Sequence, residues 1–249
     1  MEAASQRLLL YREEKAIPMA VAVVKGNLKT LAVHIEKLHP KEKVHYQALK
    51  YDRRKTSYLL GRLSAKEALS CLRGVAKVSS ICIDAGVFHF PVVQCPKTPN
   101  SQVSISHCDI IGASIAFEEA HPMGIDLEKV QDKYKEVMLS QMTEREQLLL
   151  KNIQLNNAQG YAVLWSVKES LSKVLKTGMM IDFSLLEVDS IALKGEAYTS
   201  TFTHFGQYKA ISYSCGAYVV SITCPKKSLG NFCQVWQLFD TLHIDKNGN

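Results

Sequence analysis

The chain repeats itself once, and this repeat constrains the fold more than any other feature of the sequence. Three segments recur in the same order, at separations of 104, 102 and 106 residues. They are Ala16–Lys25 with Ala120–Lys129, Lys66–Ser70 with Lys168–Ser172, and Ile105–His107 with Ile211–Tyr213. Three matches in register indicate a diverged duplication. We therefore predict two domains of similar architecture, residues 1–120 and residues 121–249.

The apolar pattern predicts both strands and helices in each half. Residues 16–25 and 123–129 are apolar runs typical of strands, whereas residues 59–72 carry leucines at helical spacing. Strand pairs are predicted within residues 103–117 and 210–223. We expect an α+β fold in which two pseudo-symmetric halves form an intramolecular pseudo-dimer, with an active site at the cleft between them.

The duplication fails at two positions, where the second half has acids. Asp126 and Glu128 correspond to Ala22 and Val24 of the first half. In a strand, residues two apart share a face, so both carboxylates would project together. Neighbouring carboxylates repel unless a cation or proton lies between them, and hard oxygen ligands suit Mg²⁺. A half-exposed strand with two solvated acids explains the same pattern, so this motif alone leaves both interpretations open.

A second motif lies in the predicted helix of the second half, which we expect to end at Gly178. Trp165, Glu169, Lys173 and two further polar residues are spaced to share one side of that helix. A carboxylate one turn before a lysine can bind a metal while the lysine holds a phosphate. The alternative is an ordinary surface Glu–Lys pair.

A third motif is Ser104-Ile105-Ser106-His107. Hydroxyl and imidazole groups at a strand end can bind phosphate oxygens, although a lone histidine is often structural. The motif lacks the Gly-x-Ser-x-Gly pattern around a nucleophilic serine, which disfavours a serine hydrolase.

Charge and cysteine content restrict the class of protein. Residues 1–100 carry 17 basic and 8 acidic side chains, whereas residues 101–249 carry 13 and 16. A basic first half suits a nucleic acid, a phosphorylated cofactor or an acidic protein. Seven scattered cysteines without a Cys-x-x-Cys pair indicate free thiols. No secretory signal is recognisable in residues 1–15, and the longest apolar run is too short to span a bilayer, so we expect a cytoplasmic location.

Taken together, the three motifs resemble the 4′-phosphopantetheinyl transferases of the large, surfactin-synthetase-activating type. The order is S-x-S-H, then G-I-D-x-E, then W-x-x-K-E-x-x-x-K-x-x-x-x-G. Tyr58–Arg62, preceded by Arg53 and Arg54, also resembles the first-half helix of that family. The resemblance covers about residues 52–178 and implies a monomer of two similar halves, which agrees with the duplication.

The resemblance also implies roles for individual residues. The implied magnesium ligands are Asp126, Glu128 and Glu169, and the implied coenzyme A contacts are Arg53, Ser106, His107 and Lys173. Glu169 and Lys173 would be catalytic, with Glu169 or a metal-bound water as the base.

One segment departs from the family pattern. The family usually has Gly-Lys-Pro or Gly-Arg-Pro before S-x-S-H, but this chain has Phe88-His89-Phe90-Pro91. A cationic contact to coenzyme A is therefore lost or moved to His89. Pro91 restricts Phe90 to an extended conformation, so we expect the segment to be a fixed edge of the pocket.

The implied reaction transfers 4′-phosphopantetheine from coenzyme A to a serine of an acyl or peptidyl carrier protein. It requires Mg²⁺ and releases 3′,5′-ADP. Carrier proteins are acidic around this serine, which gives the basic first half a partner. One alternative is an inactive module that binds nucleotide and carrier, and another is a magnesium-dependent pyrophosphohydrolase, although the chain lacks the expected glutamate-dense helix. Nucleic-acid binding is disfavoured because aromatic residues do not interleave with the basic ones.

Overall fold

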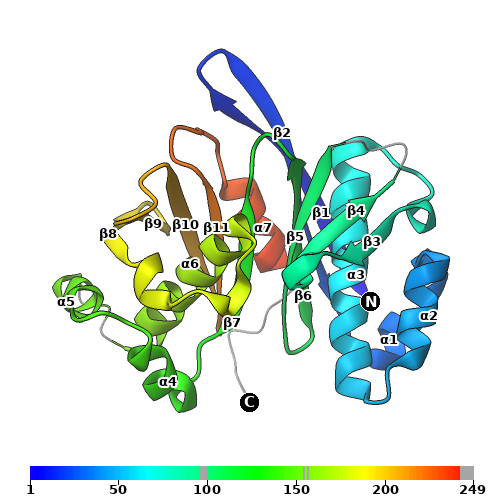
Figure 1. Cartoon of the computed structure of the whole chain (residues 1–249), viewed down its shortest axis with the longest axis horizontal. Coiled ribbons are helices and arrows are strands. Elements are labelled where there is room, and N and C mark those ends of the chain that lie inside the picture. The colour runs from blue at the N-terminus through cyan, green and yellow to red at the C-terminus, as the bar shows by residue number, and fades with distance from the viewer. Residues whose placement is uncertain (96–99, 154, 156, 242–249) are drawn as a thin grey trace. The chain divides into compact units, whose positions relative to one another are not determined.

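The computed structural model describes residues 1–95, 100–153, 155 and 157–241, which form two compact units (Figure 1). The first unit contains residues 1–122 and 229–241, and the second contains residues 123–228. Residues 229–241, which the sequence-based prediction placed in the second domain (121–249), therefore belong to the first unit. Helix α7 (Cys233–Thr241) packs on β1 (Glu2–Arg12) and β2 (Lys15–Lys25) of the first unit, where it buries Val235, Trp236 and Phe239.

The first unit is an antiparallel sheet in the order β1–β2–β6–β5, covered by the long helix α3. A short hairpin, β3–β4, follows α3. Leucines at helical spacing on α3 and the apolar run of β2 form the core, as the sequence predicts. The further elements are α1 (Leu28–Ala32), α2 (Pro40–Ala48), α3 (Asp52–Arg73), β3 (Cys82–Ala85), β4 (Pro91–Gln94), β5 (Ser101–Cys108) and β6 (Ile111–Glu118).

The second unit is an antiparallel sheet in the order β7–β11–β10–β9–β8, covered by α6. Its core consists of the apolar side chains of α6 and the side chains of the strands that face this helix. The elements are β7 (Gly124–Lys129), α4 (Lys135–Ser140), α5 (Glu144–Asn152), α6 (Ala158–Leu175), β8 (Val188–Lys194), β9 (Ala197–Phe202), β10 (Tyr208–Cys215) and β11 (Tyr218–Pro225).

The two units have a common core arrangement, and the fold is α+β as predicted. In the first, α3 packs on the adjacent strands β2, β6 and β5, and in the second, α6 packs on β7, β11 and β10. These elements follow one another in the same chain order and include all three repeated sequence segments. The pairing of the units as a pseudo-dimer stays a prediction.

The repeated lysine of each half forms a buried ion pair. In the first unit, Lys66 Nζ lies 2.9 Å from Glu42 Oε2, and both side chains are nearly inaccessible. Glu42 also accepts hydrogen bonds from the backbone N–H groups of His39 at 2.8 Å and Ile83 at 2.9 Å. It thereby caps α2, neutralises Lys66 on α3 and fixes strand β3.

The second unit contains the same arrangement. Lys168 Nζ lies 2.6 Å from Glu146 Oε2, and Glu146 accepts backbone hydrogen bonds from Thr143 and Val188, each at 2.9 Å. Glu146 thereby caps α5, neutralises Lys168 on α6 and fixes the start of β8. The lysine of the repeated Lys-Glu segment is therefore structural in both units, because a buried charge requires a partner.

We expect Lys168→Ala to lower the free energy of unfolding by about 3–5 kcal/mol, because it leaves Glu146 buried without its counter-ion. Adding Glu146→Gln should recover part of that loss. The exposed Lys151→Ala is the control and should change stability by less than about 0.5 kcal/mol. Urea unfolding monitored by circular dichroism measures all three effects. Equal stabilities of Lys168→Ala and Lys151→Ala would contradict the assignment.

Strand β7 lies so close to α6 that only glycine fits at its first position. A Cβ on Gly124 would collide with the backbone carbonyl of Ser170. We expect Gly124→Ala to destabilise the chain by about 1–3 kcal/mol through this overpacking. Gly206→Ala, at a position with open space around it, is the matched control. Thermal unfolding of the two variants provides the test, and equal melting temperatures would be inconsistent with the close approach.

Candidate functional site

Strand β7 and helix α6 bring the predicted acids of the second unit near one another. Asp126 lies mid-strand and is only 3% exposed, while Ile125 and Leu127 are packed in the core behind it. Glu128 follows on the same strand and is half-buried, as is Glu169 on α6. The alternative of two solvated acids on a surface strand is therefore wrong for Asp126.

Lys173 provides the positive charge of this group. Its Nζ lies 2.7 Å from Asp126 Oδ1 and 3.0 Å from the carbonyl oxygen of Ile125. The alternative of an ordinary surface Glu–Lys pair is wrong as well, because Lys173 pairs with Asp126. Helix α6 ends at Leu175, not at Gly178 as predicted, because Lys176 adopts the left-handed conformation with φ 59°. Lys173 therefore lies in the last helical turn, where the helix dipole favours a cation.

Two carboxyl groups of this site, those of Glu128 and Glu169, have pKa values raised toward neutral pH. Burial raises the pKa of Glu128 to about 8, and the negative charges of Asp126 and Glu169 add to the effect, against Lys173 and a hydrogen bond from Trp165. Burial and the charge of Asp126 likewise raise the pKa of Glu169 to about 7, against Lys173. A carboxyl group in this range can exchange a proton at physiological pH.

The donor chemistry of this group fits a divalent cation. Within the described part of the chain, no three His, Cys, Asp or Glu side chains are already spaced as a metal site. However, burial and, after it, the repulsion between these acids raise the pKa of Glu128 and of Glu169. A hard cation with oxygen preference would relieve that repulsion. Asp126, Glu128 and Glu169 are the residues that would hold it.

We expect Asp126→Asn to lower the pKa of Glu169 from about 7 by about one pH unit or more, because it removes a nearby negative charge and releases Lys173. Carbon-13 NMR titration of the carboxyl groups, with a chelator present, measures this. Asp189→Asn removes a carboxylate that instead pairs with Arg145, and it should leave Glu169 unchanged. An unaltered Glu169 titration in Asp126→Asn would show that these two groups do not interact.

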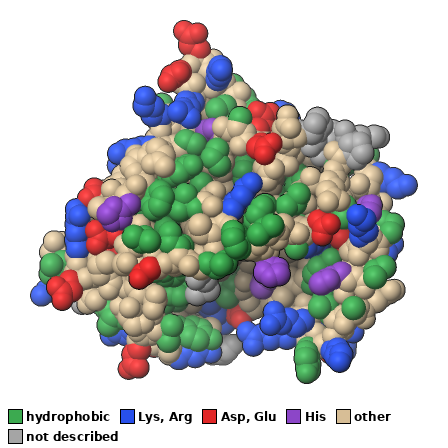
Figure 2. Space-filling view, viewed as in Figure 1, with side chains coloured by type: hydrophobic (Ala, Val, Ile, Leu, Met, Phe, Trp, Pro, Cys, Tyr) green, Lys and Arg blue, Asp and Glu red, His purple; other side chains and the backbone are tan. Residues whose placement is uncertain are grey.

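The first unit contains a separate pocket of about 350 Å³ with cationic walls. Figure 2 shows Lys, Arg and His side chains gathered on the lower right of this face, over the N-terminal end of α3. The ionisable lining comes from α2, α3, the β3–β4 hairpin and β5, and includes His45, Arg54, Arg62, Asp84, His89 and His107. Anionic ligands are therefore favoured over neutral ones.

Of the predicted coenzyme A contacts in the first unit, only His107 lines this pocket. Ser106 lies on the opposite face of β5 and is buried, because successive residues of a strand alternate sides. Arg53 is exposed on α3, and its neighbour Arg54 lines the pocket in its place. Residues that are adjacent in the sequence motifs therefore face different directions, because side chains alternate along a strand and rotate around a helix.

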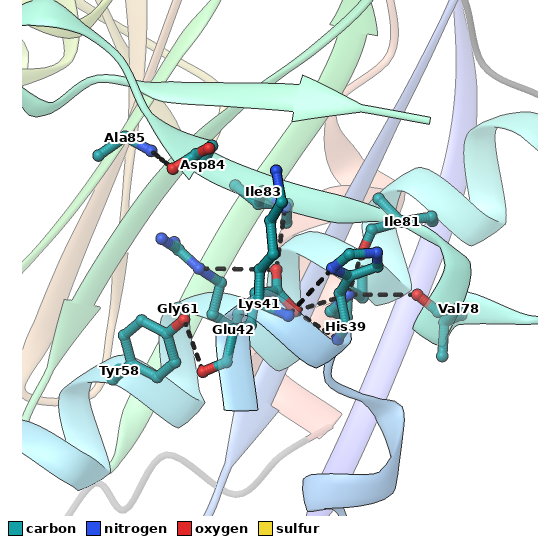
Figure 3. Close-up of polar contacts among 12 residues, drawn as sticks. His39, Lys41, Glu42, Tyr58, Gly61, Val78, Ile81, Ile83, Asp84 and Ala85 are labelled. Carbon is teal, nitrogen blue, oxygen red and sulfur yellow. Dashed lines mark hydrogen bonds and ion pairs between the residues drawn. The ribbon is translucent and has the colours of Figure 1, made fainter. Parts of the chain in front are cut away.

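An adjoining pocket of about 260 Å³ shares His45, Tyr58, Arg62 and His89 with the first. Figure 3 shows Glu42 beside the backbone of Ile83. The Tyr58 hydroxyl donates a hydrogen bond to the backbone carbonyl oxygen of Glu42. The sequence assigns no role to His45, Arg62 or Trp165. Arg62 and Trp165 stand within recognisable motifs, whereas nothing in the sequence indicates that α2 carries His45 to this pocket.

Residues 122–223 match the family model of the 4′-phosphopantetheinyl transferase superfamily. The matched segment is under half of the chain, lies almost entirely in the second unit, and includes the acidic group and Lys173. This segment therefore resembles transferases of phosphopantetheine. No match to the chain is found among curated proteins. None of the described helices is long and apolar enough to cross a membrane.

Proposed function

We propose that this chain, with a segment resembling phosphopantetheinyl transferases, transfers 4′-phosphopantetheine from coenzyme A to a serine of a carrier protein. The observation that carries the proposal is the group of Asp126, Glu128, Glu169 and Lys173 within the matched segment. Its similarity to the large, surfactin-synthetase-activating type rests on the order of the three motifs. The acceptor would be an acyl or peptidyl carrier protein.

The reaction exchanges one phosphorus–oxygen bond for another. The serine oxygen of the carrier bonds to the phosphorus that bears pantetheine, and the bond from that phosphorus to the bridging oxygen breaks. The leaving group is 3′,5′-ADP. Mg²⁺, held by the three acids, would neutralise charge on the pyrophosphate. Lys173, one turn beyond Glu169 on α6, supplies a second positive charge for those oxygens.

Glu169 is suited to accept the proton of the attacking serine. A general base works best when its pKa lies near the working pH, and without a cation the pKa of Glu169 is raised to about 7. A cation held by the same carboxylate would lower that pKa, and a water bound to the cation would then be the base. We assign the cationic pocket of the first unit to the nucleotide phosphates, with His107 and Arg54 among its contacts.

The charge distribution supports an acidic protein partner. The excess of basic over acidic side chains in residues 1–100 would steer an acidic carrier surface by long-range attraction. We further propose that the chain acts as a cytoplasmic monomer, since the duplication supplies two similar units in one polypeptide.

Intact-mass spectrometry of an apo acyl carrier protein incubated with the chain, coenzyme A and Mg²⁺ tests the proposal. We expect the mass to rise by one phosphopantetheine. Glu169→Gln should lower kcat by about 10²–10⁴-fold, because it removes, at nearly constant volume, a carboxylate assigned both to the cation and to the proton of the serine. If the wild-type chain binds coenzyme A but leaves acyl and peptidyl carriers unmodified, the protein is a binding module and the proposal is wrong.

The duplication provides a matched control for this variant. Glu67 occupies the position of Glu169 in the repeat, but its carboxylate pairs with Lys37 at 2.7 Å. We expect Glu67→Gln to retain wild-type kcat, because a partly exposed ion pair contributes little. If Glu67→Gln and Glu169→Gln lower kcat equally, Glu169 has no specific role in the reaction.

A further inference from the structure

Basic side chains are concentrated in one short stretch of the first unit. Residues 28–55 form α1, α2 and the start of α3, and they carry eight Lys and Arg side chains against three acids. One of those acids, Glu42, is buried in its pair with Lys66. Figure 2 shows Lys, Arg and His side chains gathered over the N-terminal end of α3. The surface of this stretch is therefore strongly positive.

Lys50 and Arg53 are cations of this stretch that the sites described above do not use. Both are exposed, and neither lines either pocket of the first unit. Within the described part of the chain neither forms an ion pair, whereas Lys37 pairs with Glu67 at 2.7 Å. Exposed charges outside a ligand pocket act mainly by attracting and orienting a large partner. Arg53, to which the sequence motif assigns a coenzyme A contact, is therefore better placed for a protein.

Helix α2 presents apolar side chains to solvent beside these cations. Tyr46 packs against the core of the first unit, whereas Val44 and Ala48 lie one turn apart on the opposite side of the helix. Val44 is 68% exposed, and Tyr51, just beyond the helix, is 73% exposed. A surface helix normally has polar residues on its outer side. This face of α2 therefore offers apolar surface to a partner.

We call the surface formed by Val44, Ala48, Lys50, Tyr51 and Arg53 the α2–α3 surface. Its residues lie on α2, on the connection that follows and on the first turn of α3.

Contacts between α2 and α3 hold this surface in place. The Tyr58 hydroxyl donates to the backbone carbonyl oxygen of Glu42 at 3.3 Å, and its ring centroid lies 4.9 Å from that of His45. Pro40 and a capping box between His39 and Glu42 fix the start of α2. A surface that is already ordered loses little conformational freedom when a partner binds.

The α2–α3 surface adjoins the pocket of the first unit. Val44 directly precedes His45, and Arg53 directly precedes Arg54. His45 and Arg54 both line the pocket that we assign to the nucleotide phosphates. A protein docked on this surface would therefore lie beside bound coenzyme A.

The chemistry of the surface fits an acidic protein that exposes apolar side chains. Its cations complement negative charge, and its apolar residues gain free energy by leaving water. A single-stranded nucleic acid would need several exposed aromatic rings for stacking. Among residues 28–55, all of which the structure describes, Tyr51 is the one aromatic residue that is exposed. The surface therefore favours a protein over a nucleic acid.

We propose that the α2–α3 surface docks the acidic carrier protein that accepts phosphopantetheine. Lys50 and Arg53 face carboxylates of the carrier. Val44 and Tyr51 contact its apolar side chains. The inference rests on the proposed function for the identity of this partner.

Stopped-flow binding of the full chain to a fluorescently labelled apo acyl carrier protein, without coenzyme A, tests the charges. We expect Lys50→Glu combined with Arg53→Glu to lower the association rate constant by about tenfold at low salt, because these charges steer the encounter. The difference from wild type should shrink as salt screens them. Lys226→Glu combined with Lys227→Glu is the control, because it changes net charge equally at exposed residues of the second unit. The control should change the rate by less than about twofold.

The same binding measurement tests the apolar contacts. Val44→Gln and Tyr51→Ser should each raise the dissociation rate constant by about tenfold, because the loss of a buried contact acts mainly on dissociation. Leu193→Gln, at a side chain that is 61% exposed on β8, is the control. Circular dichroism of each variant confirms folding. Wild-type rates in the charge-reversed variant, or in both apolar variants, overturn the inference.

Other ligands provide a second test of the same surface. The Kd for coenzyme A should change by less than about twofold in the charge-reversed variant, because Lys50 and Arg53 lie outside both pockets. Equal losses of coenzyme A and carrier binding would place these cations in the coenzyme A site and overturn the inference. If the variant loses affinity for a single-stranded oligonucleotide but binds the carrier normally, the partner is a nucleic acid and the inference is wrong.

These measurements separate the inference from the proposed function. Carrier binding through the α2–α3 surface without modification of the carrier would support the docking surface and reject the transferase. Carrier modification with a wild-type KM for the carrier in the charge-reversed variant would support the transferase and reject the docking surface.

Discussion

The buried lysine–glutamate pair is the interaction on which each unit of this protein depends. A charge removed from water must find an opposite charge and hydrogen bonds, which leaves few arrangements of the chain around it. Glu42 and Glu146 meet that demand in the same way, each joining a helix cap, the long helix and a strand. Arg62 lies within two turns of Lys66 on α3, and Glu169 and Lys173 lie within two turns of Lys168 on α6, so the pair also sets the direction of these side chains.

The duplicated framework has diverged where its strands and helices offer side chains to a ligand. In the first unit, Ala22 and Val24 are fully buried, and ionisable side chains line a cationic pocket instead. In the second, the corresponding strand carries Asp126 and Glu128, and Lys173 compensates the buried acid. One framework thus presents positive charge in one unit and negative charge in the other. That is the complement that the proposed function requires for a phosphorylated substrate and a divalent cation.

The two sites carry ionisable groups of different kinds. In the second unit, burial and mutual repulsion raise the pKa of Glu128 and Glu169 toward neutrality. In the first, the ionisable walls of the pocket include Arg54 and Arg62 beside the histidines His45, His89 and His107. Local rules are broken at both places: acids are buried on β7, and an aromatic residue is left-handed before His89. Such departures concentrate at functional sites, where the surrounding fold offsets their cost.

The sequence by itself determined the α+β class, the duplicated core elements and the acids of β7, because periodicity and repeated motifs are local properties of a chain. It also indicated Glu169 and Lys173, since helical spacing fixes which side chains share a face. Only the tertiary structure decided that Lys173 pairs with Asp126 and that residues 229–241 join the first unit. It likewise separated Ser106 from His107 and brought His45 and Arg54 to the pocket. Those outcomes depend on contacts between residues far apart in the sequence. Packing and the burial of charge determine the geometry of these contacts, and neither produces a local sequence pattern.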